Sequence, residues 1–431
     1  MAGLQHQQRP KQQGLGTLLM AILLLLGASI VLLYLNRSVI FEQKTSANQQ
    51  RSTMALEVAE AGLEWAIGML NNPEISNSSC ELGTGSDLSF RNTYIQFSNT
   101  QPPTLPTVTP AQPGCRIEGI QLSCSCPAAG SAALGAASTP SFSVAFDAVP
   151  LADDPTGESV RITSLGCTAS TQACTAASSG QADATATVSM VVKLRAMLRA
   201  GPAAALTCGT SCKVSGAFTL VNTSVASNGI LINAGTTITQ GAGTRLVSLP
   251  GAPSANALVP NDTSLANLSG SDGQCNNSAV FNAYFGTTIE SYASAPTTKS
   301  IICNSAATCG ELTLDAYENG WRAFYFPAGV EFNNSTGFST LGTETQPVIL
   351  VTPQSLNING NITINGLIFS NSANVNDLGT GSANIQGAMM TCGAYDNNGS
   401  GVLSYSDQIL GNLAKNTSAV VKVPGSWRDF Q

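Results

Sequence analysis

Residues Leu15 to Leu35, LGTLLMAILLLLGASIVLLYL, form an uncharged apolar run that decides how the whole chain is organised. An α-helix of about 21 residues, at about 1.5 Å per residue, spans a hydrocarbon layer of ~30 Å. The sequence therefore predicts a membrane helix close to the N-terminus.

Helical patterning continues beyond this run, where an ordinary secretory signal would end in a cleavage site and globular sequence. No proline occurs between Pro10 and Pro73, and the Asn71-Asn72-Pro73 run predicts the end of the helix. An apolar stripe with gaps of three and four supports one continuous helix and consists of Leu56, Ala59, Leu63, Ile67 and Leu70. A rod from Leu15 to Asn72 would be roughly 85 Å long. Because one small domain cannot cover such a rod, we expect it to pack against identical or related helices.

The composition is typical of a turn-rich β protein outside the cytoplasm. Of the 431 residues 10% are charged, and the formal net charge is -7. An acidic chain with 18 Lys+Arg residues shows no nucleic-acid-binding footprint. The length exceeds that of one hydrophobic core and predicts two folded units.

All twelve cysteines follow the apolar run, and their close pairs predict disulfides made in an oxidising compartment. The alternatives are free thiols or a metal site. Zinc favours repeated two-residue gaps with histidine, however, and the single histidine, His6, is far from every cysteine. We therefore predict no metal and no cofactor. Because disulfides form on the oxidising side of the membrane and all the cysteines follow the apolar run, we place the N-terminus in the cytoplasm. The candidate pairs are Cys167 with Cys174, Cys208 with Cys212, and Cys303 with Cys309.

The remainder of the chain has two textures. From Cys80 to about Leu198, period-two alternation predicts antiparallel strands packed on the emerging helix. After Gly201, short strands are separated by Asn and Gly, and INGLIFS at Ile364 recurs 21 positions later as IQGAMMT at Ile385. This shift predicts about one coil of a parallel β-helix, and a β-sandwich with two similar hairpins is the alternative.

The N-terminal region resembles the type IV prepilins. The leader ends in KQQG, and the apolar helix runs on into MALEVAEAGLEWAIGML. Roughly residues 9 to 72 are similar to the PilX-like minor pilins, with AEAGLEWA at Ala59 to Ala66 the most distinctive part. The C-terminal YSDQILGNL and VPGSWRDF also look similar to the ends of that family.

The resemblance implies a maturation pathway and a location. A prepilin peptidase would cut between Gly14 and Leu15 and N-methylate Leu15. The protein would be a single-pass inner-membrane subunit that then joins a type IV pilus at the cell surface. Such a pilus is a fimbrium that serves cell adhesion and twitching motility. Its partners would be other minor pilins, the major pilin and a large tip adhesin.

One position departs from the family pattern. Most major pilins carry glutamate at the fifth mature position, which pairs with a neighbour's amino terminus, whereas this chain has Leu19. An uncompensated carboxylate in lipid is costly, so its absence favours a priming or tip subunit that need not dock onto a preceding one. The alternative is that Leu19 is simply a better membrane residue.

Two charged faces follow the apolar run. A neighbouring subunit displaced along the axis would set the basic face against the acidic one, and solvated charges are the alternative. The basic face, at seven-residue spacing, is Arg37, Lys44 and Arg51, and the acidic face is Glu57, Glu60 and Glu64.

The predicted fold class is α+β: a long pilin helix, a pilin-like antiparallel β head and a C-terminal β-rich domain resembling a parallel β-helix. The predicted divisions are a leader at 1–14, a transmembrane and assembly helix at 15–72, the head at 73–200 and a β-solenoid-like domain at 201–431. An irregular insertion is expected at about 249–345.

Two other functional classes are alternatives to the minor pilin. A K-type pseudopilin of type II secretion also lacks the fifth-position glutamate, but it carries a helical insertion where this chain is β-rich. A membrane-tethered carbohydrate-active β-helix enzyme would need only a plain anchor, and a chain cleaved after Gly14 would contain no histidine. We predict no enzyme, because no acid–base pair stands out among the loop carboxylates Asp153, Asp154, Glu158, Asp377 and Asp396. The DNNGSG stretch at Asp396 is interpreted as a tight turn rather than a calcium loop.

Overall fold

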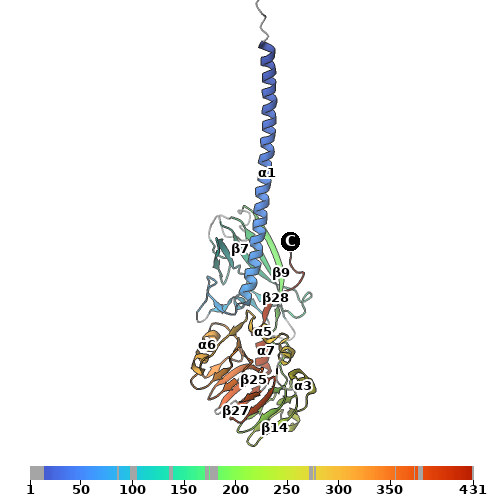
Figure 1. Cartoon of the computed structure of the whole chain (residues 1–431), viewed down its shortest axis with the longest axis vertical. Helices are drawn as coiled ribbons and strands as arrows, with labels where there is room; N and C mark the ends of the chain where they lie inside the picture. Colours follow the sequence, from blue (N-terminus) through green and yellow to red (C-terminus); the bar gives the residue numbers. More distant parts are fainter. Residues whose placement is uncertain are drawn as a thin grey trace, which may run out of the picture.

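The protein consists of a long N-terminal helix followed by a β-rich part in two bodies that lie in line (Figure 1). The computed structural model describes residues 14–84, 87–97, 104–134, 139–169, 174, 183–270, 275, 278–354, 356–372, 374–376 and 382–429. Residues 1–13 of the predicted leader lie outside this set. The body beside the C-terminal part of the helix is called the head, and the body beyond it, residues 201–416, the distal body.

Helix α1 (Gly14–Asn71) is unbroken over 58 residues, as the missing prolines predict. The predicted apolar stripe faces the head: Ala59, Leu63, Ile67 and Leu70 are buried, and Leu56 is partly buried. Asn71 ends the helix and joins it to the far end of the chain. Its side-chain amide donates to the carbonyl of Val420 at 2.9 Å and accepts from the Val420 N–H at 2.7 Å.

The head is an antiparallel six-stranded sheet on which α1 lies. Its strand order is β28-β9-β8-β7-β5-β6. Two glycines let the helix come close: a Cβ on Gly62 would lie 2.9 Å from the Phe142 ring, and one on Gly166 would lie 2.5 Å from the Ala59 nitrogen. The strands are β5 (Gly114–Glu118), β6 (Gln121–Ser125), β7 (Ser141–Ala148), β8 (Ser159–Cys167), β9 (Thr185–Arg195) and β28 (Ala419–Lys422).

The division at residue 201 does not account for strand β28, which pairs antiparallel with β9 although it lies near the end of the chain. The chain therefore leaves the head, builds the distal body and returns to complete the head sheet. Smaller elements around the head are β1 (Ile75–Ser76), β2 (Leu88–Ser89), α2 (Phe90–Tyr94), β3 (Ile95–Gln96) and β4 (Thr107–Val108).

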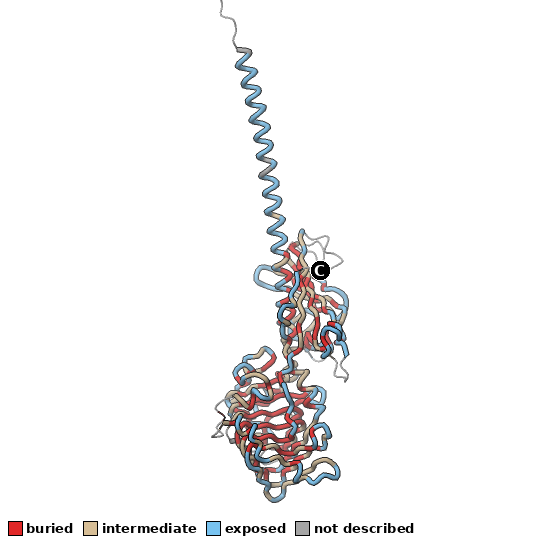
Figure 2. Tube along the Cα trace, turned by 90° about the vertical axis from the view of Figure 1, so that its right-hand side faces the viewer, coloured by how far each residue is buried: buried red, intermediate tan, exposed pale blue. Residues whose placement is uncertain are grey.

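The distal body is built from parallel strand pairs that belong to three sheets. In the longest pair, Ile364 lies beside Ile385 and Gly366 beside Gly387, which is the 21-residue shift seen in the sequence. The glycines allow close stacking, since a Cβ on Gly387 would lie 2.0 Å from the carbonyl oxygen of Gly366. The buried residues run through the interior of the distal body (Figure 2), and their aliphatic and aromatic side chains form a hydrophobic core.

The strands of the distal body are mostly three to five residues long. The first group is β10 (Leu206–Cys208), β11 (Cys212–Val214), β12 (Thr219–Val221), β13 (Ile232–Ala234), β14 (Ile238–Gln240), β15 (Arg245–Val247) and β16 (Leu258–Val259). The second group is β17 (Thr298–Ser300), β18 (Ala323–Tyr325), β19 (Val330–Phe332), β20 (Thr340–Leu341), β21 (Val348–Thr352) and β22 (Leu356–Ile358). The third is β23 (Thr363–Ser370), β24 (Asn374–Asn376), β25 (Ala383–Thr391), β26 (Ala394–Asn397) and β27 (Gly401–Tyr405).

The spatial order of the strands differs from their order in the chain. Strand β25 pairs with β23 and also with β10, so the earliest strands of this body stack against its latest ones. The connection from β16 to β17 carries three helices, α3 (Thr263–Ser269), α4 (Ala279–Phe285) and α5 (Ile289–Ala293). The expected irregular insertion at 249–345 is thus only partly irregular, because β17, β18 and β19 pair with the parallel strands. Strands of three residues are too short to show alternation in the sequence.

All twelve cysteines are paired, and the three candidate pairs are among the disulfides. The pairs are Cys80–Cys126, Cys115–Cys124, Cys167–Cys174, Cys208–Cys212, Cys275–Cys392 and Cys303–Cys309. Cys275–Cys392 closes the longest loop, 117 residues, and ties the helical connection to the residue that follows β25. In the chain-entropy model, a disulfide lowers the conformational entropy of the unfolded chain more when the loop that it closes is longer. Cys275–Cys392 is therefore expected to stabilise the fold more than each of the other five disulfides.

Candidate functional site: the exposed part of helix α1

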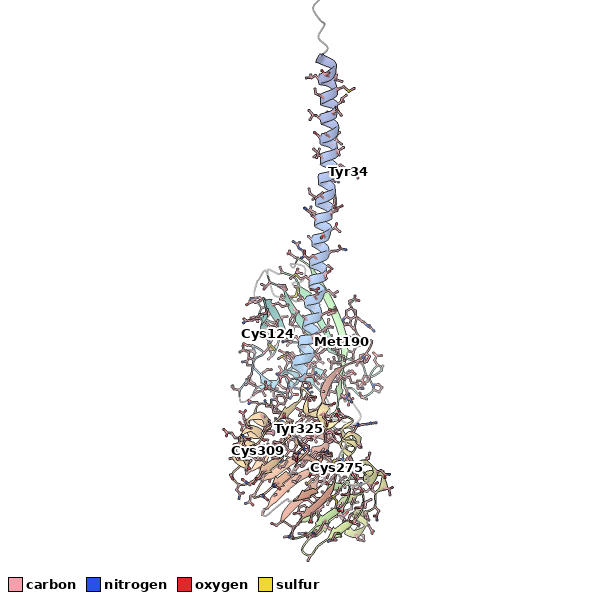
Figure 3. All side chains as sticks on the ribbon, viewed as in Figure 1. Tyr34, Cys124, Met190, Cys275, Cys309 and Tyr325 are labelled. Carbon is pink, nitrogen blue, oxygen red and sulfur yellow. A yellow bond between two sulfur atoms is a disulfide. The ribbon has the colours of Figure 1, made fainter. Side chains whose placement is uncertain are left out.

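The N-terminal two thirds of α1 has no neighbour to cover its apolar surface. Of the side chains described between Gly16 and Met54, only Ala47 is partly covered. Leu24 is 73% exposed and Tyr34 is 76% exposed, and Tyr34 projects freely from the helix (Figure 3). We call residues 16–54 the exposed rod. The stretch up to Leu35 is apolar on every side, and such a helix needs lipid or other helices around it.

By length and composition this helix is able to cross a membrane. Its most apolar 18-residue window has a mean hydropathy of 2.8 and none of it is buried within the protein. The head lies beside the C-terminal part of the helix and the distal body lies beyond it (Figure 1), so both bodies would share one side of a bilayer.

The predicted processing and assembly residues lie at the start of this rod. Gly14 and Leu15 are in the first turn of α1, and the side chain of Leu15 lies outside the described set. Leu19 is 59% exposed and has only apolar neighbours in sequence apart from Thr17.

The predicted charged faces of helix α1 are mostly exposed as well. Arg37, Lys44 and Arg51 all point outward, and the Arg37 guanidinium lies 5.8 Å from the centre of the Phe41 ring. Glu57 and Glu60 are exposed, whereas Glu64 forms an ion pair with Lys422 of β28. Glu64 of the predicted acidic face is therefore paired within the protein. An exposed ion pair of this kind contributes about 0–1 kcal/mol to the free energy of unfolding.

The candidate carboxylates that the structure describes are divided between two bodies, and Asp396 lies in strand β26 rather than in a loop. Asp154 is buried, and Glu158 lies in the same loop of the head. Asp396 is in the distal body, paired with Lys213 at 3.0 Å, and Asp377 lies outside the described residues. Among the described residues no group of His, Cys, Asp and Glu could hold a metal ion.

Asp154 organises its own loop. Its carboxylate accepts hydrogen bonds from the Thr156 hydroxyl at 2.7 Å, the Glu158 N–H at 3.0 Å and the Lys193 ammonium at 3.1 Å. Burial by itself would raise the pKa of Asp154, but these donors outweigh it and hold that pKa well below its usual range. Asp154 is therefore a structural anion of the head.

Replacing Asp154 by Asn is expected to lower the free energy of unfolding at pH 7 by about 1–3 kcal/mol, because several donors lose a charged acceptor. A carboxyl group whose pKa is lower in the folded state contributes stability above its unfolded pKa of about 3.9, and that contribution is lost as the pH falls below it. Urea unfolding of both proteins at pH 7 and pH 3 tests this. An equal difference at the two pH values would contradict it.

Comparison with known proteins gives faint likeness among solved structures. No family model matches the chain, and neither does any curated protein. Among solved structures, the competence-associated pilin ComZ from Thermus thermophilus is 8% identical, with a TM-score of 0.21 over 88% of this chain and 97% of that chain. A TM-score this low does not establish a common fold.

Proposed function

We propose that the protein is a minor pilin of a type IV pilus, similar to the PilX-like family, which primes assembly or sits at the filament tip. The observation that carries the proposal is the exposed rod: a helix whose apolar first half is exposed, continuous with a segment that packs on a β head. Burying such a rod among the helices of other subunits would keep its apolar surface out of water once the protein leaves the membrane. The partners would be other minor pilins and the major pilin.

The priming or tip position rests on Leu19. A shaft subunit would need a carboxylate there to neutralise the amino terminus of a neighbour, and leucine cannot do so. The head and distal body would then be presented outside the cell for adhesion, together with a large tip adhesin.

We further propose that the distal body is a parallel β-helix. Its parallel strand pairs, the stacked glycines at positions 366 and 387, and the buried aliphatic core support this classification. A stack of this kind is a rigid spacer, which suits a body that carries a binding surface away from the membrane.

The intact mass of the mature protein, isolated from cells that make filaments, tests the proposal. We expect a chain that begins at Leu15 with one added methyl group. Replacing Gly14 by Ala, or deleting the prepilin peptidase, should leave the full-length form in the inner membrane. A protein that still begins at Met1 in piliated cells would refute the assignment.

A further inference from the structure

The head and the distal body meet directly beside the end of α1. The Ile75 N–H donates to the carbonyl of Asn319 at 3.1 Å, and the Trp321 indole donates to Glu74 at 3.3 Å. Gly320 lies so close to the segment that follows α1 that a Cβ there would be 2.2 Å from the carbonyl oxygen of Pro73. These contacts join the helix end to the turn between α6 (Ala306–Glu318) and β18.

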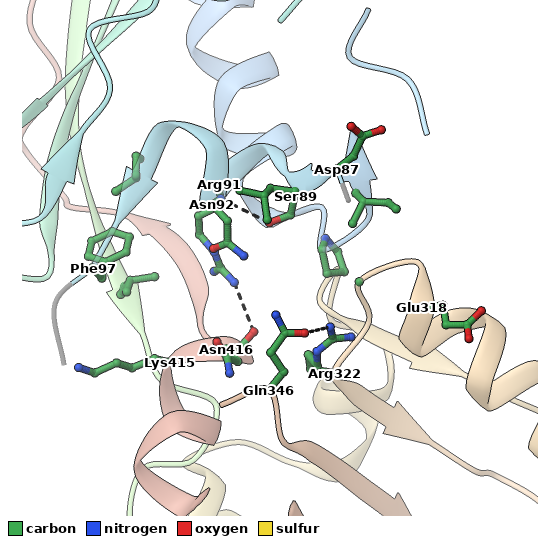
Figure 4. A pocket seen from close by; sticks show the side chains of 16 residues that line it. Asp87, Ser89, Arg91, Asn92, Phe97, Glu318, Arg322, Gln346, Lys415 and Asn416 are labelled. Carbon is green, nitrogen blue, oxygen red and sulfur yellow. Dashed lines mark hydrogen bonds between the residues drawn. The ribbon is translucent and has the colours of Figure 1, made fainter. Parts of the chain in front are cut away.

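A cavity of about 370 Å³ lies at this junction (Figure 4). Its walls come from α2 of the head, from the turn after α6, and from the end of α7 (Asp407–Asn416). The lining is mainly polar and includes the amides Asn92, Gln346 and Asn416. A volume of this size accommodates a small organic molecule or a hydrated ion.

Arg91 supplies the first buried positive charge of the cavity. The residue is 9% exposed, and its guanidinium donates to the carbonyls of Ser418 at 2.6 Å and Asn416 at 3.4 Å. Both acceptors are neutral. Burial lowers the pKa of Arg91 to about 10, so the group stays charged at neutral pH.

Arg322 supplies the second positive charge, from the distal side. Its guanidinium donates to the carbonyls of Tyr317 and Trp321 at 2.6 and 2.7 Å and to the Gln346 side chain, and it lies 4.0 Å from the centre of the Tyr317 ring. Burial lowers the pKa of Arg322 as well. Within the described part of the chain, neither Arg91 nor Arg322 forms an ion pair with a carboxylate.

The other charged groups of the lining do not neutralise these two arginines. Lys415 adds a third cation and interacts electrostatically with Glu158. Asp87 accepts a hydrogen bond from the Thr84 N–H at 2.8 Å, and Glu318 is exposed. In Figure 4 both carboxylates lie at the margin, while Arg91, Gln346 and Arg322 surround the centre. A buried cation that meets only neutral acceptors is costly, and an oxyanion would relieve that cost.

We propose that this junction cavity binds a small oxyanion, a carboxylate or a phosphate-type group, between Arg91 and Arg322. Guanidinium groups bind such anions through paired N–H donors, and the surrounding amides supply further donors. The ligand would bridge the two bodies. This inference goes beyond the proposed assembly function and does not depend on it.

The sequence carries no signal for this site. Arg91 and Arg322 are isolated arginines from different bodies, and no motif links them. The competing interpretation is that both arginines only clamp the chain, since Arg91 already holds residues near β28. A pure clamp would show no saturable response to anions.

The test uses the full chain in detergent micelles and measures the binding of sodium phosphate, sulfate and glucuronate by titration calorimetry, with chloride at equal ionic strength as the reference. We expect at least one of the three to bind saturably below ~10 mM. A response to phosphate and sulfate alone identifies the source as a phosphate-type group, and a response to glucuronate alone identifies a carboxylate. No saturable binding of any probe overturns the proposal.

Three variants make the assignment specific. Arg322→Gln should weaken binding by about 10-fold or more, because charged hydrogen bonds are lost. Gln346→Glu should abolish binding while leaving the protein folded, since it places a permanent carboxylate beside Arg322. Arg245→Gln removes an exposed cation of the distal body and should change nothing. Unchanged binding in Gln346→Glu would show that the anion sits elsewhere and would refute the site.

Discussion

A lysine at position 24 is expected to abolish incorporation of the protein into filaments. Leu24 lies within the apolar run and is 73% exposed, so the new charge would face lipid or neighbouring helices rather than the protein's own core. A lysine near the centre of a membrane span costs about 2.5–3.5 kcal/mol in insertion alone. Sheared filaments and membrane fractions, probed with an antibody to the distal body, measure the loss.

The matched control puts the same charge on another exposed apolar residue. Val225 is 80% exposed on the distal body, and Val225→Lys should leave both insertion and incorporation unchanged. Leu24→Ile, which keeps the apolar surface, should also behave like the parent protein. Normal incorporation of Leu24→Lys would show that the exposed rod is not the assembly surface.

Immunogold labelling of the parent protein distinguishes a position at the filament tip from a position along the shaft. Scarce label or label at one end is expected, and Leu19→Glu should not increase the number of copies along the fibre. Loss of the whole protein should reduce the number of filaments and leave their diameter unchanged. Dense, regular label along the shaft would instead make this a major subunit with an unusual fifth residue.

Replacing Gly166 by Ala is expected to give the second large effect, a loss of about 1–3 kcal/mol in the free energy of unfolding. A Cβ at this position would lie 2.4 Å from the carbonyl oxygen of Ala55 and 2.5 Å from the nitrogen of Ala59. Both are backbone atoms of α1, so no side chain can rotate away and the helix must lift from β8. Moving the helix away from the sheet would loosen the buried apolar stripe that holds α1 against the head.

Gly68→Ala is the matched control, because it adds the same methyl group to α1 where nothing lies within 4 Å. It should raise stability by about 0.5–1 kcal/mol, since alanine favours a helix over glycine. Urea unfolding followed by tryptophan fluorescence compares the two, and Trp65 reports on the interface because its ring lies 5.5 Å from that of Phe142. If both variants were equally stable, helix and sheet would not be in close contact at Gly166.

Local patterns in the sequence were enough to predict helix α1 and the face it buries. The missing prolines, the stop at Asn71 and the stripe at Ala59, Leu63 and Ile67 are all short-range signals, and short-range signals decide helices. The close cysteine pairs and the 21-residue shift between Ile364 and Ile385 are also local enough to detect by eye.

Only the tertiary structure decided which distant segments meet. β28 completes the head sheet, β10 stacks on β25, and Arg91 contacts a carbonyl 327 residues away in the sequence. Strands of three residues carry no measurable period, and an isolated arginine carries no motif. Their neighbours are selected by burial and hydrogen bonding once the chain has folded back on itself, so the junction cavity could not be predicted from the order of the residues.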